Sequence, residues 1–476
     1  MKRSLSLILA LFLILPLIPV GAEENALYPV RVDGLWGYMD RAGKIVIEPQ
    51  WDQAGPFDGT AAVVGKGASY PDRLYGMVLR DGSLAVPVAY PGIWDCGPFI
   101  LFSDQFFMDY GLTGWYHKDS GFFQEPVFNF VDRRPSSNGL VYAGWVDRGK
   151  GVFENFYNDV YTRSAEYHDA YYRLDSGEAV FSPDLPAAKG YTPGVFHEGY
   201  AAWRLANDND LRYLLFDANG RQSEFPEGIF PFLDVCGGVV AVCDGSGFGL
   251  ARPDGTLILD PFYDWIYPAG EGKVLFGTGD LIGVMDTEGN VLLPPVLDYD
   301  PDWFLFNDIP DMRYRSGFAL LGVRDGKNTH AYVFLNLEGQ IICTVPTRPD
   351  EVPSYAVRSQ VMENGLVWYS GTSRDDDGVV KMLYGLIRLS QDGFEYLTEP
   401  VFDRVAIPDN GIVSFSEGLF PVRQKGLWGY IDENAAWIIP PQYRKAESFR
   451  DGLAMVEKDG KLMYIDHSGA VVWEER

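Results

Sequence analysis

The hydrophobic positions of the chain fall in short runs that are separated by turn-forming residues. A typical run, Leu-Trp-Gly-Tyr-Ile at 427–431, is followed by Asp432 and then by a second apolar run, Trp-Ile-Ile at 437–439. Runs of this length that are rich in β-branched and aromatic residues and bounded by Gly, Asp, Asn or Pro predict β-strands. The pattern therefore predicts an all-β chain.

The same pair of runs returns along the sequence. The two clearest copies are GLWGYMDRAG at 34–43 and GLWGYIDENA at 426–435. When the Gly that closes each turn is taken as a register mark, the marks follow one another at intervals of 34 to 56 residues. The marks are Gly43, Gly82, Gly121, Gly177, Gly220, Gly255, Gly289, Gly339, Gly393, Ala435 and Gly469. The chain thus predicts about eleven tandem units.

Proline forms a second column, five to seven residues after the mark in each of the first ten units. These residues are Pro49, Pro87, Pro126, Pro183, Pro226, Pro261, Pro294, Pro346, Pro400 and Pro440. Since proline cannot donate a hydrogen bond to a neighbouring strand, we expect it to end the strand that follows the mark.

The residues before the mark indicate its conformation. Asp, Asn or Ser stands three residues earlier in seven units, at Asp40, Asp217, Asp286, Asn336, Ser390, Asp432 and Asp466. This spacing is typical of a type I turn followed by a left-handed Gly, which joins two strands in a hairpin. A third apolar run precedes the pair, as at 418–422. Each unit is therefore expected to be a three-stranded antiparallel meander, with a fourth strand where insertions are long.

Glycine also recurs six residues before the mark, at Gly37, Gly76, Gly249, Gly283 and Gly429. Because Gly weakens a strand unless something packs close to its backbone, we expect a side chain from the neighbouring unit to lie over it. Other units depart from this column and have Trp115, Tyr171, Leu214, Val333 or Met463 there.

The run Gly-Leu-Trp-Gly-Tyr-Ile-Asp, continued by Ile-Ile-Pro-Pro-Gln-Tyr up to Tyr443, resembles the bacterial WG-containing repeat (WG β-repeat). The resemblance implies an all-β repeat protein, often exported or surface-linked, of a family for which no general enzymatic activity is established. One meander cannot bury both faces, so neighbours must stack. Closed propellers typically hold four to eight blades, and about eleven three-stranded antiparallel β-meander repeats therefore favour an open superhelical or propeller-like array over residues 23–476.

The N-terminal segment has the three parts of a secretory signal peptide. Lys2 and Arg3 precede an apolar run at 5–20, and Gly21 and Ala22 suit a cleavage site. We expect residues 1–22 to be removed, leaving a secreted or cell-surface protein without a membrane span. The formal net charge of −27 argues against nucleic acid as a partner, because phosphate binding needs clustered Lys and Arg.

No catalytic motif is found. The five histidines are scattered, the Gly-Xaa-Ser-Xaa-Gly elbow of hydrolases is absent, and neither a cofactor nor a metal site is expected. The acidic runs 375–378 and 207–210 are interpreted as solvated hairpin tips, with calcium binding as the less favoured alternative. The four cysteines match no zinc pattern, and a disulfide between Cys236 and Cys243 is left open.

Insertions into repeats often carry binding residues. Segment 142–172 is rich in aromatic residues, and segment 298–314 mixes Trp303 and Phe304 with several Asp residues. The candidate ligand-binding residues are Trp145, Tyr167, Tyr171 and Tyr172. The alternative is that these rings cover the repeat core. The sequence thus favours a secreted non-enzymatic scaffold that binds an extracellular protein or a cell-wall glycan, with a glycoside hydrolase as the alternative.

Overall fold

The structure, a computed structural model, describes residues 25–69, 71–105, 111–134, 136–146, 167–182, 191–205, 213–299, 312–324, 330–347, 355–357, 361–374, 380–405 and 415–475. Within these ranges the chain is all-β, apart from one 3-10 turn at Glu363–Gly365. Across the same ranges, no helix has the length and apolar character that crossing a bilayer requires. The predicted signal peptide at 1–22 lies outside the described residues.

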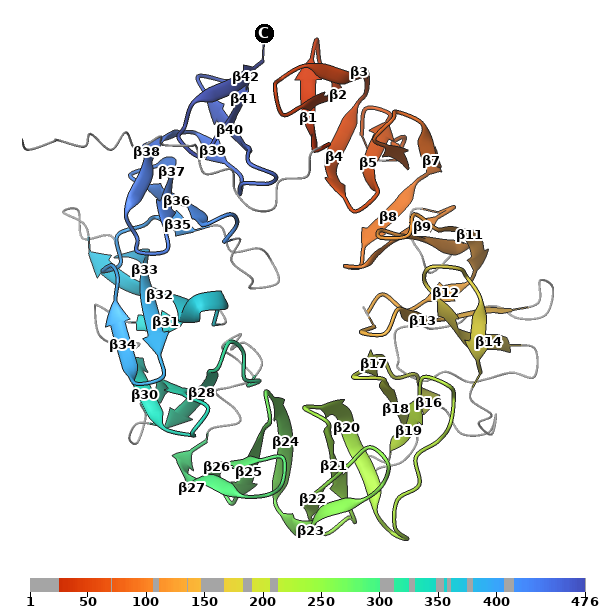
Figure 1. Ribbon diagram of the computed structural model, residues 1–476, viewed down its shortest axis with the longest axis vertical. Coiled ribbons are helices and arrows are strands. Elements are labelled where there is room, and N and C mark those ends of the chain that lie inside the picture. The colour runs from red at the N-terminus through yellow and green to blue at the C-terminus, as the bar shows by residue number, and fades with distance from the viewer. Residues whose placement is uncertain are drawn as a thin grey trace, which may run out of the picture.

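The described strands form eleven small antiparallel sheets, nine with four strands and two with three. Figure 1 shows that the sheets follow one another around a ring, as the blades of an eleven-bladed β-propeller. The all-β prediction and the propeller-like arrangement are confirmed. The expectation of three strands per unit is wrong for most blades, because a further short strand usually precedes the meander on its inner side.

The first six blades have the following strands. Blade 1 contains β1 (Leu27–Val32), β2 (Leu35–Asp40) and β3 (Ile45–Trp51); blade 2 contains β4 (Gln53–Asp58), β5 (Ala61–Lys66), β6 (Leu74–Leu79) and β7 (Leu84–Tyr90); blade 3 contains β8 (Gly92–Asp95), β9 (Phe99–Ser103), β10 (Thr113–His117) and β11 (Phe123–Phe128). Blade 4 contains β12 (Phe130–Val131), β13 (Leu140–Val146), β14 (Tyr167–Arg173) and β15 (Ala179–Phe181); blade 5 contains β16 (Tyr191–Thr192), β17 (Phe196–His197), β18 (Tyr200–Leu205) and β19 (Tyr213–Asp217); blade 6 contains β20 (Phe230–Cys236), β21 (Val239–Cys243), β22 (Phe248–Ala251) and β23 (Leu257–Tyr263).

The last five blades continue the order. Blade 7 contains β24 (Trp265–Gly270), β25 (Lys273–Thr278), β26 (Leu281–Asp286) and β27 (Val291–Asp298); blade 8 contains β28 (Ala319–Arg324), β29 (His330–Leu335) and β30 (Ile341–Thr347); blade 9 contains β31 (Tyr355–Val357), β32 (Leu366–Arg374), β33 (Val380–Ser390) and β34 (Gly393–Tyr396). Blade 10 contains β35 (Arg404–Val405), β36 (Leu419–Gln424), β37 (Leu427–Asp432) and β38 (Trp437–Tyr443); blade 11 contains β39 (Lys445–Ala446), β40 (Ala454–Lys458), β41 (Lys461–Ile465) and β42 (Val471–Glu474).

The hairpin tips confirm most of the predicted register marks. Ten of them have positive φ, including Gly43 at 82° and Ala435 at 61°. The Gly43 amide donates to Asp40 O at 3.0 Å, and Asp40 Oδ1 accepts from Lys44 N at 3.0 Å. Gly393 is the exception, because it pairs with Ser390 across a two-residue turn and begins β34. The prediction of a left-handed tip at Gly393 is therefore wrong.

Two tips are one residue longer than expected. The Gly121 amide donates to His117 O, and the Gly177 amide donates to Arg173 O, four residues back instead of three. The extra residue shifts the register of the preceding strand. In blade 3 the glycine of the repeat is therefore Gly114 and not position 115.

The recurrent Gly and Pro face each other inside one blade. Gly37 opposes a bulge of three residues, since Trp36 pairs with Trp51 and Tyr38 with Ile47. A Cβ on Gly37 would lie 2.7 Å from Pro49 N and in contact with Ile47 O. The expectation that proline ends the strand is thus wrong, because β3 continues through Pro49. The expectation that a side chain of the neighbouring unit covers the glycine is also wrong, because the backbone of the same blade lies over Gly37. Proline is tolerated there because a bulge on an edge strand has no ladder bond to lose.

The contact between blades is made by the tyrosine that follows this glycine. Tyr430 is fully buried, its hydroxyl donates to Glu447 O at 2.8 Å, and its ring lies 4.9 Å from that of Phe449 in blade 11. Tyr38 makes the same contact with Gly55 O and Phe57 in blade 2. Each of these rings removes apolar surface of two neighbouring blades from water.

The ring closes where blade 1 meets blade 11 (Figure 1). Tyr28 OH donates to Asp451 O at 2.6 Å, and Tyr464 OH donates to Pro29 O at 2.8 Å. The Arg31 guanidinium holds both carboxylate oxygens of Glu475, at 2.8 and 3.2 Å. β1 and β42 belong to different sheets, so the described part of the chain closes through side chains and not through a shared sheet.

We predict that Gly429→Ala destabilises the fold by about 1–3 kcal/mol, the usual cost of overpacking. A Cβ at this position would lie 2.7 Å from Pro441 N. Gly393→Ala is the matched control, because nothing lies within 4 Å of its Cβ position and its φ is not positive. Urea unfolding measures both, and equal stability of the two variants would contradict the bulge packing.

We predict that Glu475→Gln weakens ring closure by about 0.5–1 kcal/mol, the range for partly exposed ion pairs. The hydrogen bond from Arg31 lowers the pKa of the Glu475 carboxyl. The ionised form therefore stabilises the fold at neutral pH, and this contribution disappears as pH falls through the lowered pKa. The melting temperatures of the wild type and the variant should differ at pH 7, and the difference should shrink as pH falls through the lowered pKa of Glu475. If Glu475→Gln lowers the stability equally in a protein that already carries Arg31→Gln, the effect does not come from the Arg31–Glu475 ion pair.

Candidate functional site

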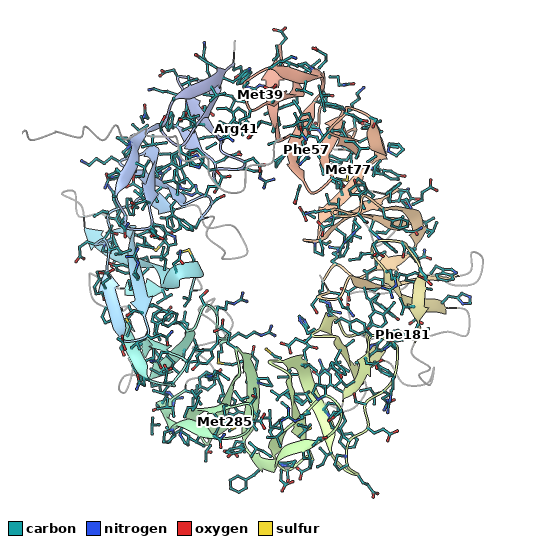
Figure 2. The ribbon with its side chains drawn as sticks, in the orientation of Figure 1. Met39, Arg41, Phe57, Met77, Phe181 and Met285 are labelled. Atoms are coloured by element: carbon teal, nitrogen blue, oxygen red, sulfur yellow. The ribbon has the colours of Figure 1, made fainter. Side chains whose placement is uncertain are left out.

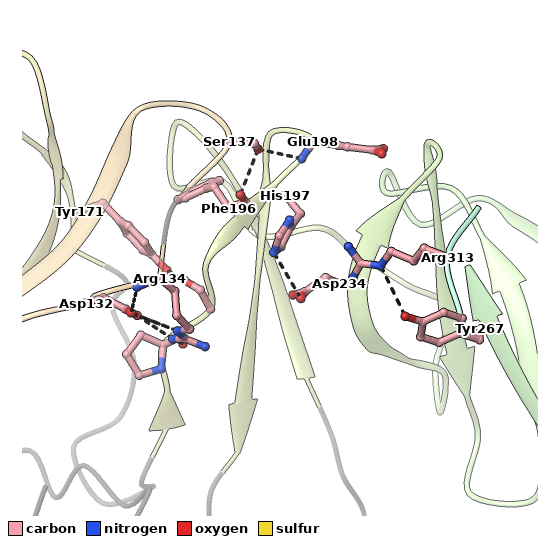
Figure 3. A network of polar contacts seen from close by, with 12 residues as sticks. Asp132, Arg134, Ser137, Tyr171, Phe196, His197, Glu198, Asp234, Tyr267 and Arg313 are labelled. Carbon is pink, nitrogen blue, oxygen red and sulfur yellow. Dashed lines mark hydrogen bonds and ion pairs between the residues drawn. The ribbon is translucent and has the colours of Figure 1, made fainter. Parts of the chain in front are cut away.

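Polar side chains from blades 4 to 8 gather on the inner wall of the ring, where β17, β20 and β24 are the innermost strands (Figures 1 and 3). We call Arg134, His197, Asp234, Tyr267 and Arg313 the inner-wall cluster. Each comes from a different blade or its approach segment: Arg134 follows β12, and Arg313 precedes β28. Residues that are 179 positions apart in sequence are thus brought into one network.

Asp234 lies in an irregular part of β20. The pairing register shifts between Phe232 and Cys236, and the backbone of Leu233 is left-handed with φ of 67°. Bulges re-aim side chains, and a bulky residue in this conformation is rare and costs free energy. Such strain is typical of functional sites. Here it stands directly before the central carboxyl of the cluster.

The charge environment of Asp234 is mixed. His197 Nε2 lies 3.8 Å from Asp234 Oδ2, and the two side chains are 37% and 39% exposed. Burial by neighbouring atoms raises the pKa of the Asp234 carboxyl, and the nearby His197, Arg313 and Arg134 side chains oppose this rise. The carboxyl is therefore accessible to a ligand and more easily neutralised than an ordinary aspartate.

Arg134 joins blade 4 to blade 5. Its Nε donates to Asp132 Oδ1 at 3.0 Å, and its Nη2 donates to Asp132 Oδ2 at 2.6 Å and to Pro193 O at 3.0 Å. Asp132 is itself buried. This two-point ion pair fixes the guanidinium, while the Arg134 side chain remains 56% exposed on the inner wall.

Arg313 joins blade 7 to blade 8. Its Nε donates to Tyr267 OH at 3.4 Å, and the next residue is fixed by a bond from Tyr314 N to Ala269 O at 2.7 Å. Figure 3 shows the Arg313 guanidinium extending from Tyr267 towards Asp234. The cluster therefore combines basic side chains with a carboxyl and a hydroxyl group. Among the described residues, no group of three His, Cys, Asp or Glu could hold a metal ion.

Glutamates at hairpin tips connect successive blades beside this wall. The Glu198 carboxylate accepts from Gly237 N and Gly238 N, both at 2.7 Å. Two further glutamates at equivalent tips, Glu271 and Glu417, accept from the next blade's Gly317 N at 2.8 Å and Gly452 N at 3.0 Å. These charge-assisted bonds hold neighbouring tips in register.

Neither the tip glutamates nor the inner-wall cluster is predicted above from the sequence. The signal for the tips was present as Glu-Gly dipeptides at 198–199, 271–272 and 417–418. The inner-wall cluster has no comparable signal, because its members share no residue type and no fixed spacing.

The four candidate aromatic residues have different surroundings. Tyr171 and Tyr172 are 1% and 6% exposed, and Tyr171 OH donates to Gly194 O while accepting from Trp203 Nε1. Their burial favours the core-covering alternative. Trp145 is 37% exposed and stacks on His168 at 5.2 Å. The side chain of Tyr167 lies outside the described part of the structure.

Other expectations fall partly or wholly outside the described residues. These are the inserted residues 147–166 and 300–311 and both acidic runs, 375–378 and 207–210. Cys236 and Cys243 lie near opposite ends of the β20–β21 hairpin, where their backbones pair with Val239 and Phe230. The disulfide that the sequence left open is not formed.

We predict that Glu198→Ala destabilises the fold by about 1–3 kcal/mol, because it removes two charge-assisted hydrogen bonds between blades 5 and 6. Glu227→Ala is the matched control, since Glu227 is exposed on a turn. Urea unfolding gives the magnitude, and hydrogen exchange should speed up at Gly237 and Gly238 only in Glu198→Ala. Unchanged exchange there would contradict a role of Glu198 in holding the next tip.

Comparison with known protein families finds the WG containing repeat at residues 36–67, 394–428 and 428–461. These segments cover parts of blades 1 and 2 and of blades 9 to 11. No curated protein matches the chain.

Several solved structures match most of the chain at low sequence identity and low TM-score. The tricorn protease is 10% identical with a TM-score of 0.19, and the match covers 94% of this chain and 62% of the protease. The extracellular domain of the hybrid two component system BT4673 from B. thetaiotaomicron is 12% identical with a TM-score of 0.21, covering 94% of this chain and 70% of that domain. The uncharacterized protein lmo1340 from Listeria monocytogenes EGD-e is 8% identical with a TM-score of 0.24, covering 94% of both chains.

The repeat signature is thus found in blades 1 and 2 and in blades 9 to 11. All eleven sheets of the ring share one antiparallel meander pattern. The chain is a β-propeller protein that carries WG containing repeats.

Proposed function

We propose that the protein is an exported, non-enzymatic scaffold that binds an extracellular partner, a cell-wall glycan or a protein, at the inner-wall cluster. One observation carries the proposal. The innermost segments of successive blades bring His197, Asp234 and Arg313 together beside a strained bulge. Ligand sites commonly combine a few convergent polar groups with a perturbed pKa.

Export is supported by the N-terminal pattern of basic, apolar and small residues at 1–22. The acidic balance of the chain disfavours nucleic acid as the partner. A polar ligand outside the cell is consistent with both features.

A binding role is favoured over hydrolysis by the state of two carboxyls, Asp234 in the cluster and Asp132 beside Arg134. Glycosidases need one carboxylic acid and one carboxylate that are free to act on the scissile bond. Asp132 is buried and held at two points by Arg134. This leaves Asp234 as the accessible carboxyl of the cluster, where it can accept a hydrogen bond from a ligand.

The test is a glycan array combined with a hydrolase substrate panel on the purified exported protein. We expect retention of a defined set of glycans, at least a tenfold loss in Asp234→Asn, and no turnover of any polymer. The matched control is Asp260→Asn, which changes an exposed carboxylate on β23. Equal binding by both variants would move the site away from the inner wall. Turnover of any polysaccharide would overturn the non-enzymatic assignment.

A further inference from the structure

The inner-wall cluster is a row to which five successive blades contribute one residue each. Arg134 comes from blade 4, His197 from blade 5, Asp234 from blade 6, Tyr267 from blade 7 and Arg313 from the segment that enters blade 8. Since packed sheets lie about 10 Å apart, four steps from one blade to the next span up to about 40 Å. A ligand that contacts the whole row is therefore a chain of several units.

The row faces the centre of the ring. Figure 2 shows that described side chains from opposite sides of the ring do not meet there. The Arg134 side chain is 56% exposed, and those of His197 and Asp234 are 37% and 39% exposed. A long ligand can therefore lie against the row without displacing a described blade.

The pair in the middle of the row fits a hydroxyl group. His197 Nε2 and Asp234 Oδ2 are 3.8 Å apart, too far for a hydrogen bond between them. Within the described part of the chain, the Asp234 carboxyl accepts no hydrogen bond. A hydroxyl placed between the two atoms can donate to Asp234 and accept from His197, because it has both capacities. An ammonium group cannot accept and a carboxylate cannot donate, so the pair favours a hydroxyl over either ion.

The basic groups beside this pair already have partners. Arg134 donates to both carboxylate oxygens of Asp132, and Arg313 donates to Tyr267 OH. A charged ligand would compete with such contacts and leave a former partner unpaired, which costs free energy in a partly buried site. An uncharged ligand leaves these contacts in place.

The direction of the row favours a glycan over a peptide. Extended peptides gain affinity by pairing their backbone with the edge of a strand. Figure 3 shows that the row runs across the inner strands, so a chain that follows it cannot form such a ladder. A glycan has no such requirement, because the hydroxyls of each ring bind side chains one at a time.

Resting on the proposed function, we infer that the inner-wall cluster binds an uncharged glycan chain that lies across blades 4 to 8. His197 and Asp234 together hold one hydroxyl near the middle of the chain. Arg134 and Tyr267 contact units on either side of it. Affinity therefore rises with chain length until the oligomer covers the row.

The test is calorimetric titration of the exported protein with β-1,4-linked oligomers of glucose and of N-acetylglucosamine, from the dimer to the hexamer. We expect the hexamer of at least one series to bind at least about tenfold more tightly than its dimer, the effect of one or two further hydrogen bonds. Hexamers of galacturonate and of glucosamine are the charged probes, and hexaserine with blocked ends is the peptide probe. Each of these should bind more weakly than the best uncharged hexamer.

Two variants in separate blades test whether one chain covers the row. His197→Ala and Tyr267→Phe should each weaken binding of the hexamer about three- to tenfold. At most one of them should weaken the shortest oligomer that binds, because that oligomer cannot reach both blades 5 and 7. Tyr75→Phe on β6 of blade 2 is the matched control for the lost hydroxyl. Thermal unfolding of all three variants checks that the blades remain folded.

Each outcome separates this inference from the proposed function. Equal affinity for dimer and hexamer, or equal losses in Tyr75→Phe and Tyr267→Phe, would overturn the chain assignment. Tighter binding of a charged hexamer would overturn the uncharged class, and tighter binding of hexaserine would replace the glycan with a peptide. If no oligomer binds but Asp234→Asn abolishes retention of an array glycan, the inference fails and the proposed function stands. If Asp234→Asn changes no binding at all, both fail.

Discussion

The fold depends on the burial of one blade face against the next. A small meander has two faces and can shield neither alone, so each blade is stabilised chiefly by its neighbours. The tyrosine that follows the repeat glycine carries this contact, as Tyr38 and Tyr430 show by inserting a ring and a hydroxyl into the next blade. The glycine and proline of the repeat make the insertion reproducible. They set a bulge that fixes where the strand bends and therefore where the tyrosine lies.

Blade 8 shows what happens to the bulge when the repeat glycine is absent. Val333 replaces the glycine there, and β29 and β30 pair without a bulge at that point. The proline of this unit, Pro346, pairs directly with Ala331. The bulge therefore forms where glycine leaves room for it, and proline alone does not impose it.

The sequence predicted the parts of this fold that recur. Turn glycines need a left-handed conformation in each unit, so their spacing gave the number of blades and nearly every hairpin tip. The exact length of individual turns was predicted less well. The longer tips at Gly121 and Gly177 and the two-residue turn before Gly393 differ from the other units by local hydrogen bonding, which composition does not encode. Closure into a ring depends on contacts between Tyr28 and Asp451 or Arg31 and Glu475, more than four hundred residues apart.

The candidate site lay beyond sequence reasoning for a related reason. Repetition reveals what blades share, whereas the inner-wall cluster uses what distinguishes blades 4 to 8 from the others. Its members, from Arg134 to Arg313, converge only because the innermost strands all face the same centre. Aromatic content led instead to Tyr171 and Tyr172, which are buried.

The seam between blades 1 and 11 has a consequence for the whole architecture. The junction joins two complete blades through tyrosine hydroxyls that donate to carbonyl oxygens of the other blade, as Tyr38 and Tyr430 do between consecutive blades. Cutting the backbone in any linker between blades and joining the segments near β1 and β42 would leave all sheets intact. The ring therefore does not require that the chain begin at blade 1, and a circularly permuted chain should fold into the same ring of blades.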